Sequence, residues 1–158
     1  MIKAEIVVDF TKWKTKIKNP NLYFNKKIKK LSSLRSLKTK NFEFTLLLTN
    51  KTAIKKLNKR FRKKNKETDV LSFPMNSRFN TNYKGDIAIC YEIINLRSKK
   101  TNFNIEFDKM WIHGLLHLFG YNHIKLRDYK RMLKMEQDIL KRVSWIWQEI
   151  ILGILFFI

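Results

Sequence analysis

All three histidines of this 158-residue chain lie within eleven residues, between His113 and His123. The apolar residues around His113 and His117 predict a helix, and residues four apart lie on the same face of a helix. Both imidazoles could therefore bind one metal ion. Gly120 adopts a left-handed conformation without strain, so it would end the helix and turn the chain until His123 reaches the same ion. The pattern predicts a metal site on a helix and the turn that follows it.

The spacing H-x3-H-x2-G-x2-H also occurs in metzincin proteases, where three histidines bind zinc and leave one position open for water. An open position favours catalysis over a structural role. Gly114 occupies the place of the metzincin general-base glutamate, which disfavours a peptidase. A metal ion still lowers the pKa of its water and polarises a phosphoryl oxygen, with a base from elsewhere. The alternatives are three satisfied core histidines, or a structural zinc site with Cys90 as its fourth ligand.

The charge of the chain favours a polyanionic partner. Lys and Arg number 34 against 13 Asp and Glu, which gives a formal charge of +21. Nucleic acid is the commonest such partner, because each neutralised phosphate releases a counterion. A solvated basic surface that reflects only codon usage, or an anionic membrane, is the alternative. Cations crowd one segment, where they either meet phosphates or complement a helix dipole: Lys59, Arg60, Arg62, Lys63, Lys64 and Lys66.

Short apolar runs and amphipathic stretches alternate along the chain and predict an α/β (α+β) fold. We expect a small mixed four-stranded sheet with about five to six surrounding helices and the metal site on a helix-turn segment. The expected strands are 3–10, which should be largely buried, 42–49, 70–73 and 86–91, with a polar loop over 75–84. The expected helices are 20–37, one that Asn50 or Thr52 caps and that carries Ile54, Leu57 and Phe61, and then 92–100, 108–119 and 126–143.

Residues 1–143 are expected to form one domain, and residues 144–158 an apolar tail of unknown role. The tail is shorter than the roughly 20 residues of a membrane span, and Glu149 interrupts it, so no span is predicted. We interpret it as a segment that packs on the domain or on a partner chain; membrane-surface contact or a frameshifted end is the alternative. Glu5 breaks the apolar stretch that a signal peptide needs, which predicts a cytoplasmic protein. Cys90, the single cysteine, is interpreted as inert packing.

The segment 113–123 resembles the signature H-G-x-L-H-L-x-G-Y-D-H of the YbeY family of bacterial rRNA-maturation endoribonucleases. Ten of the eleven positions match, free positions included. Three upstream segments are similar to family motifs in the family's order: Leu57-Asn58 with Phe61-Arg62, then Thr68-Asp69-Val70-Leu71-Ser72-Phe73-Pro74, then Gly85-Asp86-Ile87. The resemblance extends from near the N-terminus to about Val143.

This resemblance implies a mixed α/β fold, one zinc ion on His113, His117 and His123, and single-strand-specific endoribonuclease activity. It implies work in 16S rRNA 3′-end maturation and ribosome quality control. The implied partners are rRNA, the ribosomal subunit, and ribosomal-protein or GTPase partners. Arg62 matches the family's functionally important arginine and suits bidentate binding of a scissile phosphate. Arg62, His113 and His117 are thus the implied catalytic residues.

One position of the signature differs, because Asn122 stands where the family has Asp. Asn accepts the hydrogen bond that would orient a ligand histidine, but it brings neither charge nor basicity. We therefore expect the protein still to bind zinc, and the cleavage rate is the property that this change could lower. Another acid, Asp69 or Asp86, could substitute, although both also suit turn and cap positions. The alternative function is a catalytically weak, ribosome-associated RNA-binding factor.

Overall fold

The computed structural model describes residues 2–32, 41–75 and 82–144. Its elements, in chain order, are β1 (Ile2–Val8), α1 (Trp13–Lys16), α2 (Pro20–Leu31), β2 (Phe42–Thr49), α3 (Lys51–Arg62), β3 (Val70–Pro74), β4 (Tyr83–Cys90), α4 (Tyr91–Arg97), α5 (Phe103–Leu118) and α6 (Leu126–Val143). The expected continuation of the helix over 33–37, most of the polar loop 75–84, and the apolar tail from residue 145 fall outside the described residues.

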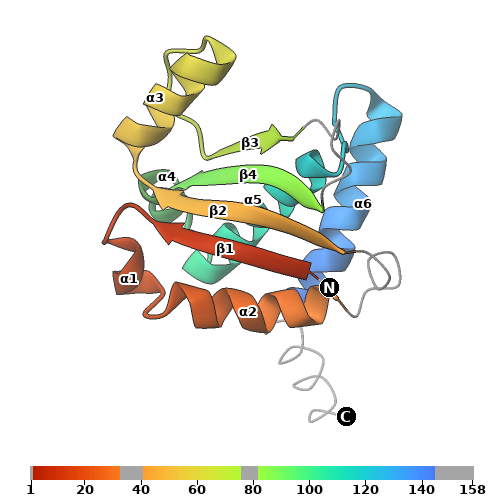
Figure 1. The fold of residues 1–158 in the computed structure, drawn as a ribbon, viewed down its shortest axis with the longest axis horizontal. Coiled ribbons are helices and arrows are strands. Elements are labelled where there is room, and N and C mark those ends of the chain that lie inside the picture. Colours follow the sequence, from red (N-terminus) through yellow and green to blue (C-terminus); the bar gives the residue numbers. More distant parts are fainter. Residues whose placement is uncertain (1, 33–40, 76–81, 145–158) are drawn as a thin grey trace.

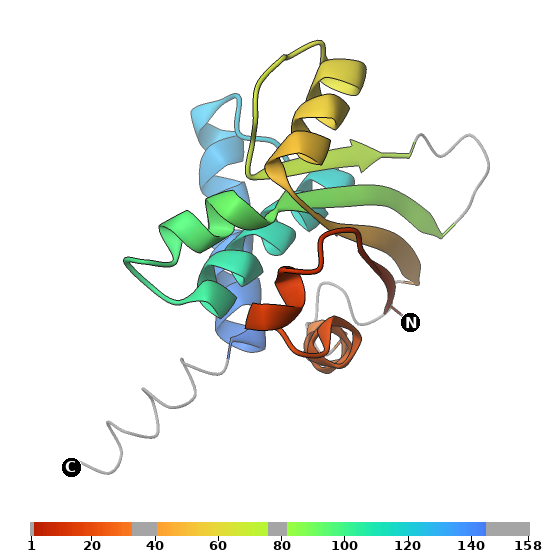
Figure 2. The same cartoon turned by 90° about the vertical axis from the view of Figure 1, so that its left-hand side faces the viewer.

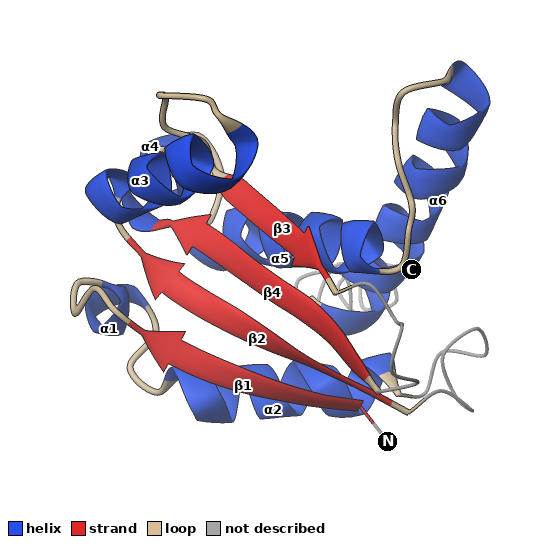
Figure 3. Cartoon of the chain, turned by 45° about the horizontal axis from the view of Figure 1, so that its top comes forward, coloured by secondary structure: helices blue, strands red, loops and turns tan. Residues whose placement is uncertain are grey.

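The four strands form one mixed sheet in the order β1-β2-β4-β3. Strands β1, β2 and β4 run parallel, and β3 pairs antiparallel with β4 at the sheet edge. Figure 3 shows β3 as the outermost strand on the side of the sheet that borders α5. The described part of the chain therefore confirms the predicted α/β (α+β) fold with a small mixed four-stranded sheet and six helices.

Helices cover both faces of the sheet (Figures 1 and 2). Helices α2, α5 and α6 pack on one face around the larger core, which includes Phe44, Leu46 and Trp111. Helix α3 packs on the other face, over β3 and β4, where a smaller core contains Ile54 and Leu71. The sheet is thus the middle layer, and the edge strand β3 lies between α3 and α5. None of the helices in the described residues combines the length and apolarity that a membrane crossing requires.

Asparagine side chains begin three of these helices. The Asn19 side chain accepts a hydrogen bond from the Leu22 N–H, and the Asn102 side chain from the Asn104 N–H. Asn50 accepts from the Ala53 N–H at 3.0 Å, so Asn50 rather than Thr52 is the N-cap of α3. Such caps satisfy N–H groups that have no partner within the helix.

Three features of the described elements differ from the sequence-based expectations: the burial of β1, the start of α5 and the presence of α1. Strand β1 is half-buried rather than largely buried, because only its alternate residues face the core and Val7 is 39% exposed. Helix α5 begins at Phe103, five residues before the expected start at 108, because Phe103 and Phe107 pack against Trp13. Helix α1 was not expected; its Trp13 is fully buried and its indole N–H donates to the Thr49 carbonyl oxygen at 3.0 Å.

A buried ion pair joins α2 to α5. The Lys27 ammonium donates to an Asp108 carboxylate oxygen at 2.6 Å and to the Val143 carbonyl oxygen at 3.1 Å. Both side chains are almost fully buried. Asp108 also accepts from the Trp111 indole and the Ser144 hydroxyl. The network fixes the first half of α5, the helix that carries His113 and His117, against α2 and the end of α6.

Candidate metal centre

Helix α5 ends in a turn that reverses the chain. Gly120 has a φ of 81°, and its N–H donates to the His117 carbonyl oxygen at 3.0 Å. The Tyr121 N–H donates to the Leu116 carbonyl oxygen at 3.0 Å. These two bonds form a Schellman motif, whose left-handed residue is most often glycine because a side chain is disfavoured at that φ. The reversal brings His123 back beside the last turn of the helix.

The three imidazoles converge at this turn, as the sequence spacing predicts. One ring nitrogen from each of His113, His117 and His123 lies within 4.8 Å of the other two. The ring centroids are 4.6 Å apart for His113 and His117, 5.5 Å for His113 and His123, and 5.2 Å for His117 and His123. The His123 side chain is exposed and the other two are partly buried.

Hydrogen bonds to the far side of two rings assign their tautomers. His113 Nδ1 lies 2.6 Å from Glu136 Oε1, and His117 Nδ1 lies 2.9 Å from the Tyr121 carbonyl oxygen. A carboxylate and a carbonyl oxygen only accept, so both Nδ1 atoms carry a proton, and in the neutral ring each Nε2 atom then presents a lone pair. Burial and then the neighbouring His113 lower the pKa of His117, which keeps this ring neutral near pH 7.

The arrangement fits a divalent cation. His113 Nε2 and His117 Nε2 lie 3.0 Å apart, and a cation between two facing lone pairs relieves their repulsion. Two imidazole nitrogens bound tetrahedrally to zinc at about 2.0–2.1 Å lie about 3.3 Å apart, close to this separation. Bonds from Nδ1 to a carboxylate and to a backbone carbonyl are the usual support of metal-binding histidines. Three imidazole ligands would leave a further coordination position for water or substrate.

The position of Gly114 explains why no glutamate stands there. Gly114 is buried on the face of α5 that contacts the sheet, one residue after His113. A β-carbon at this position would lie 2.7 Å from Ile87 Cγ2, 3.1 Å from Ser72 Oγ and 3.3 Å from Val70 Cγ2. The Ser72 hydroxyl also donates to the Gly114 carbonyl oxygen. The close packing of α5 on β3 and β4 thus excludes the metzincin base, because that side chain would enter the sheet.

The histidines open onto a cleft of about 470 Å³. Edge strand β3 contributes Val70, Ser72 and Pro74 to its lining, and Arg62 lines it from the end of α3. The Arg62 charge also contributes to the lowered pKa of His117. The structure therefore brings Arg62 to the same cleft as the three histidines, although 51 positions separate it from His113 in the sequence.

Asn58 positions the basic segment that follows Arg62. Lys63, with a φ of 59°, is the C-cap of α3, and the N–H of Lys64 donates to the Asn58 carbonyl oxygen at 3.2 Å. The buried Asn58 side chain donates to the Lys66 carbonyl oxygen at 2.8 Å. The cations of this segment lie at a helix C-terminus, where they suit the dipole, and beside the cleft, where they can meet phosphates.

Of the two acids considered as substitutes for the missing Asp, only Asp69 lines the cleft. One carboxylate oxygen accepts from the Val70 N–H at 2.8 Å, and the other pairs with Arg97 at 2.7 Å. Burial alone would raise the pKa of Asp69, but Arg97 and these hydrogen bonds bring it below its usual value. Asp86 lies on β4 and accepts a hydrogen bond from the Tyr83 hydroxyl. The cap and turn interpretation is wrong for Asp86, which lies within a strand, whereas Asp69 directly precedes β3 and accepts from its first N–H.

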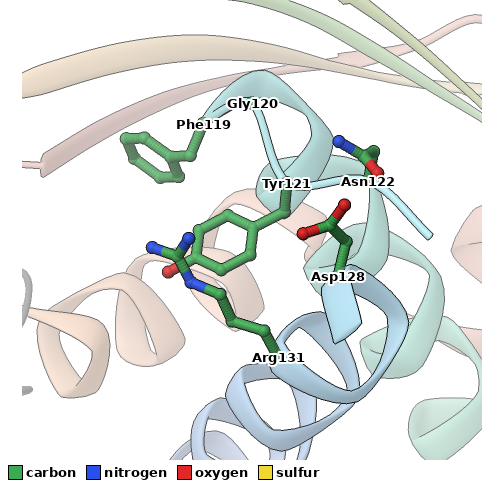
Figure 4. A pocket seen from close by; sticks show the side chains of 6 residues that line it. All are labelled: Phe119, Gly120, Tyr121, Asn122, Asp128 and Arg131. Carbon is green, nitrogen blue, oxygen red and sulfur yellow. The ribbon is translucent and has the colours of Figure 1, made fainter. Parts of the chain in front are cut away.

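Asn122 lies between two cavities. It lines the histidine cleft and also a smaller cavity of about 140 Å³ on the other side of the turn. Figure 4 shows this second cavity, with Asn122 and Asp128 at one end and the Arg131 guanidinium over the Tyr121 ring, 5.1 Å from its centroid. The Asn122 side-chain oxygen accepts from the Ile124 N–H at 3.3 Å. In this arrangement Asn122 stabilises the turn that carries His123.

Cys90 lies at the end of β4 in the smaller core, under α3. It is fully buried, and burial raises the pKa of its thiol to about 11. Among the described residues, the group able to hold a metal consists of the three histidines without Cys90. The position agrees with the interpretation of Cys90 as packing.

Glu136 is the site residue that sequence analysis missed. It comes from α6, 23 positions after His113, so no local spacing connects the two. A weak signal exists, because Glu136 is four residues after Met132 and three before Ile139, on the face that these buried side chains define. A carboxylate on such a face needs a partner, but only the packing of α6 on α5 identifies it as His113.

Comparison with known proteins agrees with this geometry. The family model described as Endoribonuclease YbeY matches residues 8–144. A Pelagibacter ubique protein named Endoribonuclease YbeY is 47% identical over 152 residues, covering 91% of this chain and 97% of the relative. A protein of that name from Buchnera aphidicola of Acyrthosiphon pisum is 39% identical, covering 78% of this chain and 81% of the relative. This chain belongs to the YbeY family.

A solved structure shares the fold of this chain. A solution structure of a Thermotoga maritima protein has a TM-score of 0.65 and 24% sequence identity, and covers 94% of this chain and 93% of its own. This similarity concerns the fold alone. The YbeY match over 8–144 includes Arg62 and the three histidines, and it ends one residue after α6.

Proposed function

We propose that this protein is a zinc-dependent, single-strand-specific endoribonuclease. The observation that carries the proposal is the cluster of three imidazoles in the same cleft as Arg62. Two of these imidazoles hydrogen-bond through Nδ1, which leaves Nε2 to bind a metal ion. Membership in the YbeY endoribonuclease family supports the reaction class. The charge of +21 supports RNA as the substrate.

In this proposal His113, His117 and His123 hold one zinc ion. When bound, the ion supplies an activated water and a Lewis acid for the phosphoryl oxygen. Glu136 and the Tyr121 carbonyl hold the first two rings in the required tautomer. Arg62 binds the scissile phosphate through two parallel N–H donors and stabilises the charge that develops on it. Arg62, His113 and His117 are thus the proposed catalytic residues.

Cleavage of a single-stranded RNA with and without a chelator tests the proposal, with metal content measured on the same samples. We expect the chelator and His117→Ala to abolish cleavage, and His117→Ala to lose bound zinc. Arg62→Ala should keep its zinc and lose about 100- to 1000-fold in kcat, the range for removing one charge-stabilising donor. Equal cleavage by wild type and His117→Ala would refute the metal mechanism.

The biological substrate that we propose is rRNA, at the 3′ end of 16S rRNA, with ribosome quality control as the wider role. In this proposal residues 1–143 form the catalytic domain. The protein binds the ribosomal subunit, with ribosomal-protein or GTPase partners, and acts in the cytoplasm. Depletion of the protein should leave 16S rRNA precursors with unprocessed 3′ ends, and the His117→Ala chain should not restore processing.

A second candidate function is an RNA-binding factor with little turnover. Asn122 favours it, because this position has no carboxylate and the Asn side chain only bonds within its own turn. Asn122→Asp separates the two candidates. Increased cleavage of single-stranded RNA identifies an enzyme that Asn122 slows, whereas an unchanged absence of cleavage identifies a binding factor.

A further inference from the structure

Phe61 is exposed where its helical position predicts burial. Its spacing after Ile54 and Leu57 places it with the apolar residues of α3, and Ile54 is fully buried. The Phe61 side chain is nevertheless 56% exposed. A large aromatic surface left in water beside a ligand cleft is a feature of binding surfaces.

The exposed Phe61 ring contacts two other flat groups. The Phe61 ring packs on Phe73 of edge strand β3, with centroids 5.1 Å apart and an interplanar angle of 60°. The Arg60 guanidinium lies over the Phe61 ring, 5.2 Å from its centroid. Phe73, Phe61 and Arg60 therefore form a tilted cluster of flat groups, here called the stack, in which the Phe61 ring stays 56% exposed. Aromatic rings and guanidinium planes are the groups on which proteins stack unpaired nucleobases.

The stack lies next to the histidine cleft, because α3 and β3, which carry Phe61 and Phe73, also line that cleft. Phe61 directly precedes Arg62, and Phe73 stands between Ser72 and Pro74; these three neighbours line the cleft. Successive residues of a strand point to opposite faces, so the stack lies on the α3 side of β3 and the cleft on its α5 side. Because β3 is the sheet edge, a flexible strand can pass around it and occupy both places.

The surrounding charge fits the same ligand. Lys59 and Lys63 flank the stack in the chain, and the cations that continue to Lys66 can bind phosphates. A protein partner that presents an apolar side chain would gain little from this concentration of one charge. An RNA strand offers a flat base for the stack and phosphates for the cations.

We propose that Phe61, with Arg60, is a stacking platform for an unpaired RNA base next to the scissile phosphate. The inference rests on the proposed endoribonuclease function and adds to it a physical basis for strand selection. Bases in a duplex already stack on one another and are inaccessible, whereas bases of a single strand are free to leave their neighbours and stack on the protein. The platform therefore favours single-stranded over double-stranded RNA.

Binding of a short fluorescein-labelled oligoadenylate by full-length protein tests the platform. Phe61→Leu retains an apolar contact with Phe73 but removes the ring, and we expect it to weaken binding about 5- to 30-fold. Phe61→Trp should bind at least as tightly as wild type. Leu22→Ala, which changes a 53% exposed apolar residue of α2, is the matched control and should have no effect. The salt dependence of binding should stay unchanged in Phe61→Leu, because no phosphate contact is removed.

A second probe, the same ribose-phosphate chain with abasic sites, should bind wild type and Phe61→Leu equally. Unchanged affinity of Phe61→Leu for the oligoadenylate would overturn the platform, as would an equal loss for the abasic probe or for duplex RNA. If Phe61→Leu binds normally and wild type cleaves RNA, only the platform fails. If Phe61→Leu binds weakly and wild type does not cleave, the platform stands and the endoribonuclease proposal fails.

Discussion

His113 Nδ1 and Glu136 Oε1 lie 2.6 Å apart and connect two helices at the outer side of the histidine cluster. His113 belongs to α5 and Glu136 to α6, and both side chains are about three-quarters buried. The carboxylate fixes the proton on Nδ1 and directs Nε2 toward His117. Helix α6 is thereby part of the site, although none of its residues belongs to the group able to bind the ion.

We predict that Glu136→Gln lowers zinc affinity about 10- to 100-fold, because the amide still accepts the His113 proton but loses the negative charge that makes the imidazole a better ligand. Competition with a chromophoric chelator measures this affinity directly. Asp138→Asn removes an exposed charge from the same helix and is the matched control. If both variants bind zinc like wild type, Glu136 does not support the ligand.

The contrast between His117 and Glu136 shows how far the sequence determines this site. The relation of His113 to His117, and the return at Gly120, follow from helix geometry and from one backbone conformation, so spacing is sufficient to predict them. The contact of Glu136 with His113 depends on how α6 packs on α5, which no local pattern encodes. Arg62 reaches the cleft only because β3 is an edge strand, and the strand order β1-β2-β4-β3 is likewise a tertiary property.

Phe61 shows a second limit of sequence analysis. Its spacing after Ile54 and Leu57 predicts an apolar helix face. That prediction holds for Ile54, which is buried against the sheet. Phe61 lies over edge strand β3, where Phe73 contacts its ring and the rest of the side chain is open to solvent. The length of a helix relative to the layer it covers decides such cases, and the sequence does not state that length.

Gly114→Ala should destabilise the protein by about 1–3 kcal/mol, because the added β-carbon would lie 2.7 Å from Ile87 Cγ2. The usual gain of about 1 kcal/mol for replacing glycine by alanine within a helix opposes this loss and does not cancel it. Urea unfolding of both proteins measures the difference. Ile87→Ala removes the Cγ2 methyl group, so Ile87→Ala combined with Gly114→Ala should lose less stability than the sum of the two single changes. An equal or higher midpoint for Gly114→Ala alone would contradict the close packing of α5 on the sheet.

The ion pair of Asp69 with Arg97 should make stability depend on acid pH. The pKa of Asp69 is lower in the folded protein than in the unfolded chain, so its carboxylate stabilises the fold above the unfolded value of about 4. This stabilisation is lost as the pH falls below about 4 and through the folded pKa. Arg97 is 45% exposed, so we expect only about 0.5–1 kcal/mol.

Asp69→Asn isolates that contribution, because the amide oxygen can still accept from the Val70 N–H. The stability difference between wild type and Asp69→Asn, taken from urea midpoints, should be largest near pH 6 and should shrink toward pH 3. A difference that stays constant over this range would show that the charge of Asp69 does not contribute.

Lys27→Met should destabilise the protein by about 3–5 kcal/mol, because it leaves the Asp108 carboxylate buried without its cation. Burial raises the pKa of Asp108 even with Lys27 present, and removal of the cation raises it further. A carboxyl whose folded pKa is raised favours the fold at low pH and loses that effect as the pH rises through the folded pKa. The deficit of Lys27→Met relative to wild type should therefore be greater at pH 8 than at pH 5.

Lys26→Met, an exposed neighbour on α2, should change stability by less than about 0.5 kcal/mol. The double variant Lys27→Met with Asp108→Asn should recover stability at pH 8, since no buried charge remains. A deficit that is independent of pH, or equal losses in Lys26→Met and Lys27→Met, would show that the buried pair does not hold α2 to α5.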